Sequence, residues 1–157
     1  MDEKRIALLQ QMAFFGGVRA EVLALLLDYS REASRRAGEF FFREGETGDF
    51  LFVLERGRVQ VLKSRGQEQV ALRELGPGEC FGEMALIDLS PRSASVLALE
   101  DCLAIEVSLA GLHAICERDI EQFALIEMNI GRELSRRLRI CDARLVSGPE
   151  SGGNAGS

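Results

Sequence analysis

The first thirty residues carry hydrophobic side chains at a helical period. Apolar residues recur every three or four positions over residues 4–29, and the paired glycines Gly16 and Gly17 interrupt them. Side chains three or four positions apart share one face of a helix. The pattern therefore predicts two amphipathic helices, with apolar faces formed by Ile6, Leu9, Met12 and Ala13 in the first and by Val22, Leu25, Leu26 and Tyr29 in the second.

The pattern changes to short strands after Gly38. Between Gly38 and Gly82, eight glycines separate short runs of alternating or β-branched residues such as FLFVLE, RVQVLK and QVALREL. Short runs of this kind between turn residues are typical of a small barrel or roll. The run SASVLALEDCLAIEV predicts two further strands with a hinge near Glu100 and Asp101. A plain β-sandwich would explain the strands but not the helices on both sides of them.

Two helices are predicted after the strands. Ser108 suits the N-cap of a helix over Leu109–Glu117, and Asp119 suits the cap of a longer helix that runs to about Leu145. The long helix has an apolar stripe at spacings of three and four, formed by Phe123, Ile126, Ile130, Leu134 and Leu138. A heptad-like seam follows, with Leu134, Leu138, Cys141 and Leu145.

Three roles for this stripe remain open. It can close over a bound ligand as a lid, it can contact the same helix of a second chain, or it can pack on its own domain only. Gly131 weakens the helix by ~1 kcal/mol relative to alanine, which is consistent with a hinge or with a close approach. Five arginines make the end of the helix basic, as favourable charge at a helix C-terminus explains, and they are Arg132, Arg136, Arg137, Arg139 and Arg144.

Length and charge narrow the classes of function. The 157 residues predict one domain, and the net charge of −6 with a pI near 5.0 argues against a general attraction to nucleic acid or anionic lipid. No apolar run approaches the ~20 residues that span a bilayer. The first fifteen residues lack the apolar core and cleavage site of a signal peptide. We therefore expect a cytoplasmic protein with no membrane partner.

The cysteines and the single histidine give little support for a metal site or for catalysis. Cys80, Cys102, Cys116 and Cys141 lack the short paired spacings of zinc or iron–sulfur ligands and are predicted to be free thiols. His113 is predicted to be structural or exposed. Without a nucleophile and base in a recognisable pairing, the sequence predicts no enzyme and no cofactor.

Residues 81–96, FGEMALIDLSPRSASV, gather groups that suit a phosphorylated sugar. Gly82 permits a close approach of main chain to a ligand, and Glu83 can accept hydrogen bonds from sugar hydroxyls. Residues 84–88 are predicted to form one helical turn, whose free N–H groups favour an anion. Arg92 can hold two phosphate oxygens, and Ser93 adds a hydroxyl. Glu83 and Arg92 also fit a simple ion pair across a loop.

The run FGEMAL followed by PRSASV resembles the phosphate-binding cassette of cyclic nucleotide-binding domains. These domains occur in the catabolite activator family, in cyclic-nucleotide-dependent kinases and in cyclic-nucleotide-gated channels. The similarity extends through RAGEFFFREGETGDFLFVLERGRVQVL, Arg36–Leu62, and covers most of residues 5–145. It implies a mostly β fold, a β-roll with flanking helices, with glycine corners at Gly45, Gly48, Gly57, Gly66 and Gly78.

The resemblance also implies the domain bounds. The cyclic nucleotide-binding domain would occupy residues 1–145, with N-terminal helices in 1–37, the roll and its cassette in 38–107 and C-terminal helices in 108–145. The remaining residues, 146–157, are rich in glycine and serine and are predicted to be a disordered tail.

By the same resemblance, Arg92 would pair with the exocyclic oxygens of a cyclic phosphate. Glu83 and the Gly82 main chain would bind the ribose 2′-OH, and the main chains of Ala85 and Ser93 would complete the phosphate site. The predicted ligand-binding residues are Gly82, Glu83, Met84, Ala85, Arg92 and Ser93.

The predicted function is binding of a 3′,5′-cyclic purine nucleotide, with a signal passed on by rearrangement of the C-terminal helix. Ser93 does not decide the base, because serine at that position accompanies both guanine and adenine in the family; we favour cAMP over cGMP. The expected protein partner is an effector or a second copy bound through the C-terminal helix, and no DNA is expected.

An alternative is a transcription regulator of the catabolite activator family that lacks its DNA-binding domain, since only twelve residues follow Leu145. An enzyme that acts on the nucleotide is the least favoured reading.

Overall fold

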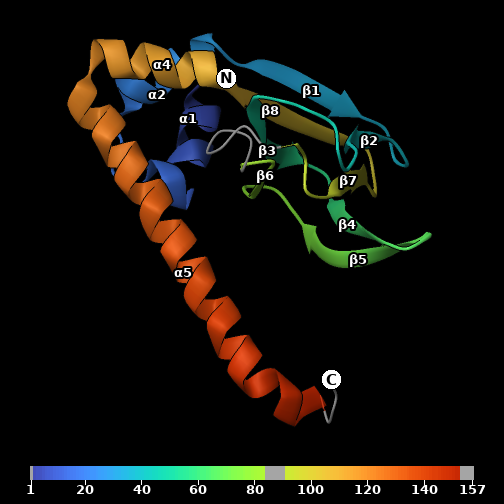
Figure 1. Ribbon diagram of the computed structural model, residues 1–157. Helices are drawn as coiled ribbons and strands as arrows, with labels where there is room; N and C mark the ends of the chain where they lie inside the picture. Colours follow the sequence, from blue (N-terminus) through green and yellow to red (C-terminus); the bar gives the residue numbers. More distant parts are fainter. Residues whose placement is uncertain (1, 84–90, 153–157) are drawn as a thin grey trace.

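The computed structural model describes residues 2–83 and 91–152, and the chain begins with three short helical segments. Helix α1 covers Asp2–Gln10, the 3₁₀ helix η1 covers Ala13–Phe15 and α2 covers Ala20–Asp28 (Figure 1). The predicted break is confirmed, since Gly17 has a φ of 78° between η1 and α2. Arg5 fixes α1 to the strands through ion pairs with Glu32 and Glu55, the latter at 2.9 Å.

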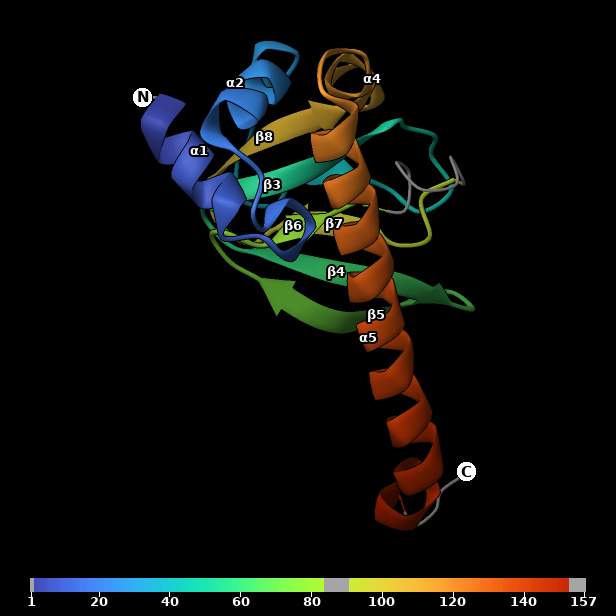
Figure 2. The same ribbon diagram turned by 90° about the vertical axis from the view of Figure 1, so that its left-hand side faces the viewer.

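In the part of the chain that the structure describes, eight strands form two antiparallel sheets, which confirms the predicted roll. The strands are β1 Arg31–Arg35, β2 Phe40–Phe42, β3 Phe50–Arg56, β4 Val59–Arg65, β5 Glu68–Leu75, β6 Cys80–Phe81, β7 Ser95–Ala98 and β8 Cys102–Ser108. Their orders are β1-β8-β3-β6 and β2-β7-β4-β5 (Figures 1 and 2). The connection between β7 and β8 passes through Glu100 and Asp101, where the hinge was predicted.

Four of the five predicted glycine corners have a positive φ, namely Gly45, Gly57, Gly66 and Gly78. At Gly57 a side chain is also excluded by space, because a Cβ there would lie 2.6 Å from the carbonyl oxygen of Asp101. Gly48 differs from these four. It has no positive φ and lies instead against the Arg92 side chain.

Strand β3 separates two hydrophobic cores and is buried on both faces. Leu51 and Val53 pack with the helices, whereas Phe52 and Leu54 face the interior of the roll. This arrangement explains why FLFVLE is almost continuously apolar rather than strictly alternating. In the interior, the rings of Phe52 and Phe81 stack with centroids 5.2 Å apart. Burial of each such side chain contributes about 1.5–3 kcal/mol.

Both predicted helix caps are present at the C-terminal end of the domain. Ser108 Oγ accepts a hydrogen bond from the Gly111 amide at 3.2 Å and begins α4, Leu109–Arg118. Asp119 Oδ1 accepts from the Gln122 amide at 3.1 Å and begins α5, Ile120–Gly152.

Helix α5 is longer than predicted. It continues through residues 146–152, which the sequence assigned to a disordered tail. Extending an existing helix avoids the cost of nucleation. This extension includes glycine, at a penalty of ~1 kcal/mol, and Pro149, which lacks an amide donor and costs ~3 kcal/mol in a helix interior. The arginines from Arg132 to Arg144 consequently lie within the helix, and its last turn has no basic residue. Their placement at a helix C-terminus was wrong.

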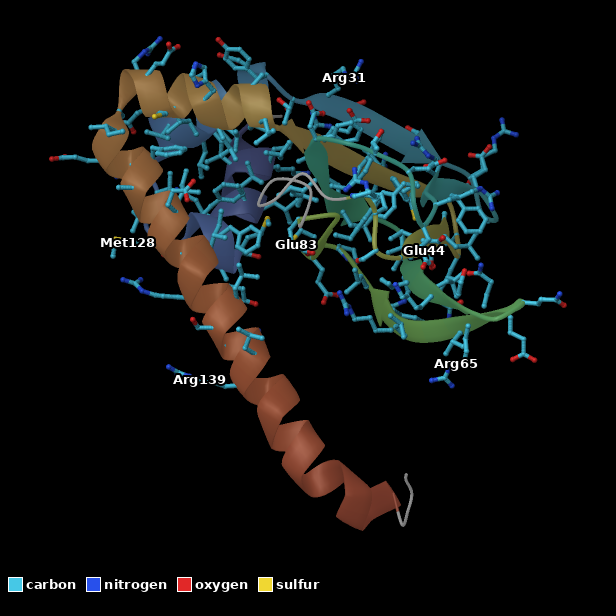
Figure 3. The ribbon with its side chains drawn as sticks, viewed as in Figure 1. Arg31, Glu44, Arg65, Glu83, Met128 and Arg139 are labelled. Carbon is cyan, nitrogen blue, oxygen red and sulfur yellow. The ribbon has the colours of Figure 1, made fainter. Side chains whose placement is uncertain are left out.

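The two parts of α5 differ in their contacts. Ile126 is 1% exposed and packs in the helical core, while Leu138 is 65% exposed. Beyond this point the helix runs away from the roll (Figure 1), and Met128 and Arg139 point outward (Figure 3). Packing on the domain itself thus accounts for only the first part of the stripe. None of the helices in the described ranges combines the length and apolar character that a membrane crossing requires.

Candidate functional site

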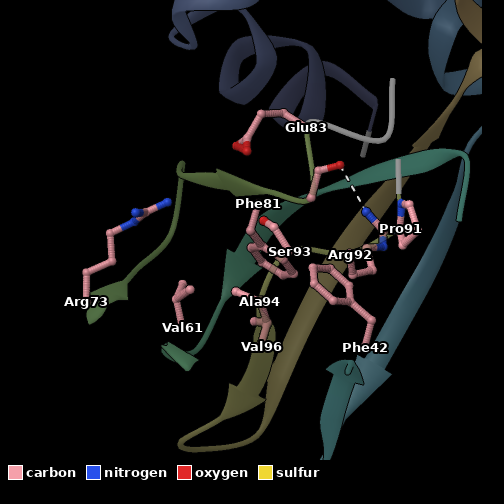
Figure 4. Close-up of a pocket in the computed structure, with 11 residues that line it drawn as sticks. Phe42, Val61, Arg73, Phe81, Glu83, Pro91, Arg92, Ser93, Ala94 and Val96 are labelled. Carbon is pink, nitrogen blue, oxygen red and sulfur yellow. Dashed lines mark hydrogen bonds between the residues drawn. The ribbon is translucent and has the colours of Figure 1, made fainter. Parts of the chain in front are cut away.

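A small pocket, with a cavity volume of about 70 Å³, opens between the roll and the segment that precedes β7 (Figure 4). Its walls come from β2, β4, β5 and β7 and from the turn after β6. The lining residues are Phe42, Val61, Arg73, Phe81, Gly82, Glu83, Pro91, Arg92, Ser93, Ala94 and Val96. Four of the six predicted ligand-binding residues therefore border one cavity, namely Gly82, Glu83, Arg92 and Ser93.

Arg92 is a buried cation at the edge of this pocket, with 6% of its surface exposed. Its Nη1 donates to the Gly82 carbonyl at 3.0 Å, and its Nη2 donates to the Phe50 carbonyl at 2.9 Å. The Cζ atom lies 4.1 Å from the centroid of the Phe42 ring, in cation–π geometry. Among the described residues, Nε has no hydrogen-bond partner. The guanidinium therefore retains a donor for an anionic ligand.

Burial dominates the electrostatics of Arg92. Desolvation lowers its pKa, and the carboxylates of Glu46, Glu83 and Asp49 act in the opposite direction. An arginine nevertheless stays protonated in proteins. The pocket thus holds a permanent positive charge in an environment where water screens it weakly, which strengthens its attraction for an anion.

Two glycines make room for this guanidinium. A Cβ at Gly48 would lie 2.6 Å from Nη2, and a Cβ at Gly82 would lie 2.6 Å from Nη1. Gly82 also has a φ of 81°, a conformation that favours glycine. The sequence predicted a close approach of main chain to ligand at Gly82, and the structure shows a close approach to Arg92.

Of the other predicted ligand-binding residues, the structure describes two and leaves two outside its described ranges. Glu83 is 7% exposed and lines the pocket, and its charge partly offsets the lowering of the Arg92 pKa by burial. Ser93 is exposed on the pocket wall, and its carbonyl accepts a hydrogen bond from Lys63. Met84 and Ala85, together with the predicted helical turn over 84–88, lie outside the described residues.

Several pocket residues were not singled out from the sequence. Phe42, Val61 and Val96 supply apolar walls, and Arg73 supplies a second cation. The alternation along RVQVLK is a usable signal for Val61, which is 5% exposed. Arg73 had no such signal, because β5 is exposed along most of its length and alternation does not identify its inner face.

The structure also places the other candidate reactive groups. Cys102 and Cys116 are free thiols. His113 is exposed and lies 3.5 Å from the carboxylate of Glu117. Over residues 2–83 and 91–152, no group of three or more His, Cys, Asp or Glu side chains is arranged to hold a metal ion.

Comparison with known proteins agrees with this architecture. The family described as cyclic nucleotide-binding domain matches residues 32–119. The chain is 33% identical over 132 residues to the cyclic AMP receptor protein of Thermus thermophilus, a match that covers 83% of this chain and 59% of that protein. It is 30% identical over 142 residues to a CRP-like cAMP-activated global transcriptional regulator of Mycobacterium tuberculosis, covering 88% of this chain and 59% of the regulator.

A solved structure gives the same result. The crystal structure of the Thermus thermophilus catabolite activator protein superposes with a TM-score of 0.75 and 32% sequence identity, over 85% of this chain and 62% of that one. The chain thus spans about three fifths of the length of these relatives. The predicted resemblance and the predicted β-roll are confirmed. Because the family match covers more than half of this chain, the chain belongs to the cyclic nucleotide-binding domain family.

Proposed function

We propose that the protein binds a 3′,5′-cyclic purine nucleotide, cAMP in preference to cGMP, in the pocket beside Arg92. The observation that carries the proposal is the buried Arg92 guanidinium, which borders the cavity and has a donor without a partner among the described residues. A cyclic phosphodiester has one negative charge and two exocyclic oxygens, which suit the forked donors of arginine.

The neighbouring groups suit the sugar and the rest of the phosphate. Glu83 and the Gly82 main chain would hold the ribose 2′-OH, since a carboxylate is an acceptor for hydroxyl donors. The main chains of Ala85 and Ser93 would complete the contacts to the phosphate. The names of the two relatives compared above specify cAMP, whereas cGMP-dependent protein kinases at 31–34% identity specify cGMP, so these names leave the base to be decided by titration.

Calorimetric titration with cAMP and cGMP tests the proposal. A charge-assisted hydrogen bond contributes ~1.5–3 kcal/mol, so Arg92→Ala should raise Kd by about one to two orders of magnitude. Arg31→Ala is a matched control, because Arg31 is exposed on β1 and does not line the pocket. No heat from the wild-type protein at high ligand concentration would reject the binding site itself.

We further propose that the protein is a regulatory module and not an enzyme, and that occupancy shifts α5. Such a shift requires the nucleotide to favour one helix position over another. Hydrogen exchange of residues 119–145 should change at saturating nucleotide, while cAMP itself should be recovered intact. Unchanged exchange would reject the helix signal without affecting the binding claim. A cytoplasmic location stays a prediction.

A protein partner for α5 is the most direct route for the signal. Leu138 is 65% exposed on the part of the helix that leaves the domain, and a second copy would cover it. Sedimentation equilibrium of wild type and Leu138→Glu measures this contact. A dimer that Leu138→Glu weakens is expected, and a wild-type monomer at high concentration would leave an unrelated effector as the partner.

The alternative function is transcription regulation, which the name of the Mycobacterium tuberculosis relative supports. Under that reading the sensor acts together with a DNA-binding segment. A mobility-shift assay with and without cAMP tests this reading. A cAMP-dependent shift would support it, whereas no shift is expected from the residues that the structure describes.

A further inference from the structure

The segment that carries Arg92 leaves the sheet before it reaches the pocket. The ladder between β4 and β7 runs from the pair Val59 and Ala98 to the pair Leu62 and Ser95, and stops there. Arg92 and Ser93 precede Ser95, so no β4 ladder bond holds them. Their position in the ligand-free protein must come from other contacts.

The turn after β2 supplies the first of these contacts. The Gly45 amide donates to the Arg92 carbonyl at 2.8 Å, and the Arg92 amide donates to the Glu46 carbonyl at 2.7 Å. The Glu44 amide donates to Ser95 Oγ at 2.8 Å. This turn and the Arg92 segment therefore form one unit, joined through main-chain and hydroxyl groups.

The second contact is a side chain that continues where the ladder ends. Lys63 Nζ donates to the Ser93 carbonyl at 2.5 Å and lies 3.3 Å from the Glu44 carboxylate. The other carboxylate oxygen of Glu44 accepts from the Ser64 amide at 2.9 Å. The hydrogen bond from the Ser64 amide lowers the pKa of Glu44, and Lys63 lowers it further, so the carboxylate stays ionised. Glu44 is thereby fixed to β4, and it orients Lys63 toward Ser93.

We infer that Glu44 and Lys63 are positioning residues for the nucleotide site, and that together they hold the Arg92 segment in its ligand-ready place. Neither residue lines the pocket, so each acts through the main chain rather than on the ligand. The inference rests on the proposed function. A site that is ordered before binding loses less conformational freedom on binding, and this raises affinity.

Lys63→Met retains the aliphatic stem and removes the donor and the charge. It should raise the Kd for cAMP and for cGMP by a similar factor, about 3- to 10-fold, because the phosphate end is common to both. Lys4→Met is the matched control, with the same change of charge at an exposed site on α1. Lys63→Arg retains a donor and a charge and should recover part of the lost affinity.

Glu44→Gln separates positioning from direct attraction. If Lys63 acted only through its charge on the phosphate, removal of the neighbouring negative charge would strengthen binding of the anion. Positioning requires the opposite, a Kd about 2- to 5-fold higher than wild type, because Gln no longer pairs with Lys63. The double variant should bind as weakly as Lys63→Met alone, since the two residues act as one unit.

The experiment combines calorimetry with hydrogen exchange of the free proteins. Faster exchange at the amides of residues 92–95 in Lys63→Met, with weaker binding and a melting temperature close to that of Lys4→Met, supports the inference. Wild-type affinity in Lys63→Met, or tighter binding in Glu44→Gln, overturns it while the proposed function stands. A wild-type protein that binds neither nucleotide overturns both.

Discussion

Arg92 and Asn129 have the same bonding pattern in two different places. Each side chain donates to two main-chain carbonyls, Arg92 to Gly82 and Phe50, and Asn129 to Phe14 at 3.2 Å and Gly16 at 2.9 Å. Both are almost fully buried, with 6% and 8% of their surface exposed. One is a charged residue at the rim of a cavity, and the other is a neutral amide between α5 and η1.

This difference decides what each pair of hydrogen bonds is for. Under the proposed function, a phosphate in the pocket would offer Arg92 oxygens in place of main-chain carbonyls, so its bonds would be exchangeable. Asn129 does not line that pocket, and its bonds attach the first part of α5 to the N-terminal helices. A buried donor that loses its partner costs about 1–3 kcal/mol. We therefore expect changes near Arg92 to affect affinity and changes at Asn129 to affect stability.

Gly48→Ala is expected to have the largest effect on binding. The new Cβ would lie 2.6 Å from Arg92 Nη2 and would displace the guanidinium, although the backbone at residue 48 can accept alanine. The Kd for cAMP should rise on the order of tenfold to a hundredfold, as when an arginine contact is lost. Calorimetry measures it.

Gly131→Ala is the control for that change. Nothing lies within 4 Å of a Cβ at Gly131, so affinity should stay at the wild-type value while the helix gains up to ~1 kcal/mol. Wild-type affinity in Gly48→Ala would show that the observed place of the guanidinium is not the one that binds ligand.

Asn129→Asp tests the other side of the comparison. Aspartate has the shape of asparagine but cannot donate, so the bonds to Phe14 in η1 and to Gly16 after it are both lost. The free energy of unfolding should fall by about 1–3 kcal/mol, and Kd should change less than about threefold. Denaturant unfolding and calorimetry provide the two values. A large loss of affinity without a loss of stability would contradict this assignment.

Arg73→Ala sharpens the comparison with an exposed arginine of the same pocket. A guanidinium only donates, and guanine offers two acceptors, O6 and N7, where adenine offers one acceptor and one donor. Removing Arg73 should therefore weaken cGMP by about 3- to 10-fold and cAMP less. Competition binding with both nucleotides measures the ratio. An equal loss for both would assign Arg73 to the charge of the pocket and not to the base.

The smallest expected effect concerns acid. The hydrogen bond from the Gln122 amide, with a further contribution from Arg19, lowers the pKa of Asp119. A carboxylate with a lowered pKa stabilises the fold above the unfolded value, and this contribution is lost as the pH falls through the folded value, below about pH 4. Asp119→Asn keeps the cap but does not titrate, so its unfolding free energy should fall less steeply in acid. If the unfolding free energies of wild type and Asp119→Asn fell equally steeply in acid, Asp119 would not contribute to the loss of stability.

The sequence predicted well wherever the determinant was local. Ser108 and Asp119 cap helices because each accepts from an amide three residues on, and the positive-φ glycines sit at turns for a reason internal to the residue. Gly82, Glu83, Arg92 and Ser93 were found together because they lie within twelve residues of the chain. Local patterns of this kind require no knowledge of the tertiary fold.

The parts that were missed depend on distant segments. Gly48 looked like one more corner, and its contact with Arg92 exists only because the two segments meet in the folded roll. Arg73 reaches the pocket from an exposed strand with no alternation to orient it. The end of α5 was placed too early because glycine and serine weaken a helix without setting its last residue.

The position of the Asn129 contact also determines how far the end of α5 moves when the helix tilts. About 35 Å of α5 extends past this residue at 1.5 Å per residue, so a rigid tilt of about 10° there would carry the distal turns some 6 Å. A small displacement of α5 close to Asn129 would therefore be amplified at the far end to a movement about as large as the pitch of one helical turn.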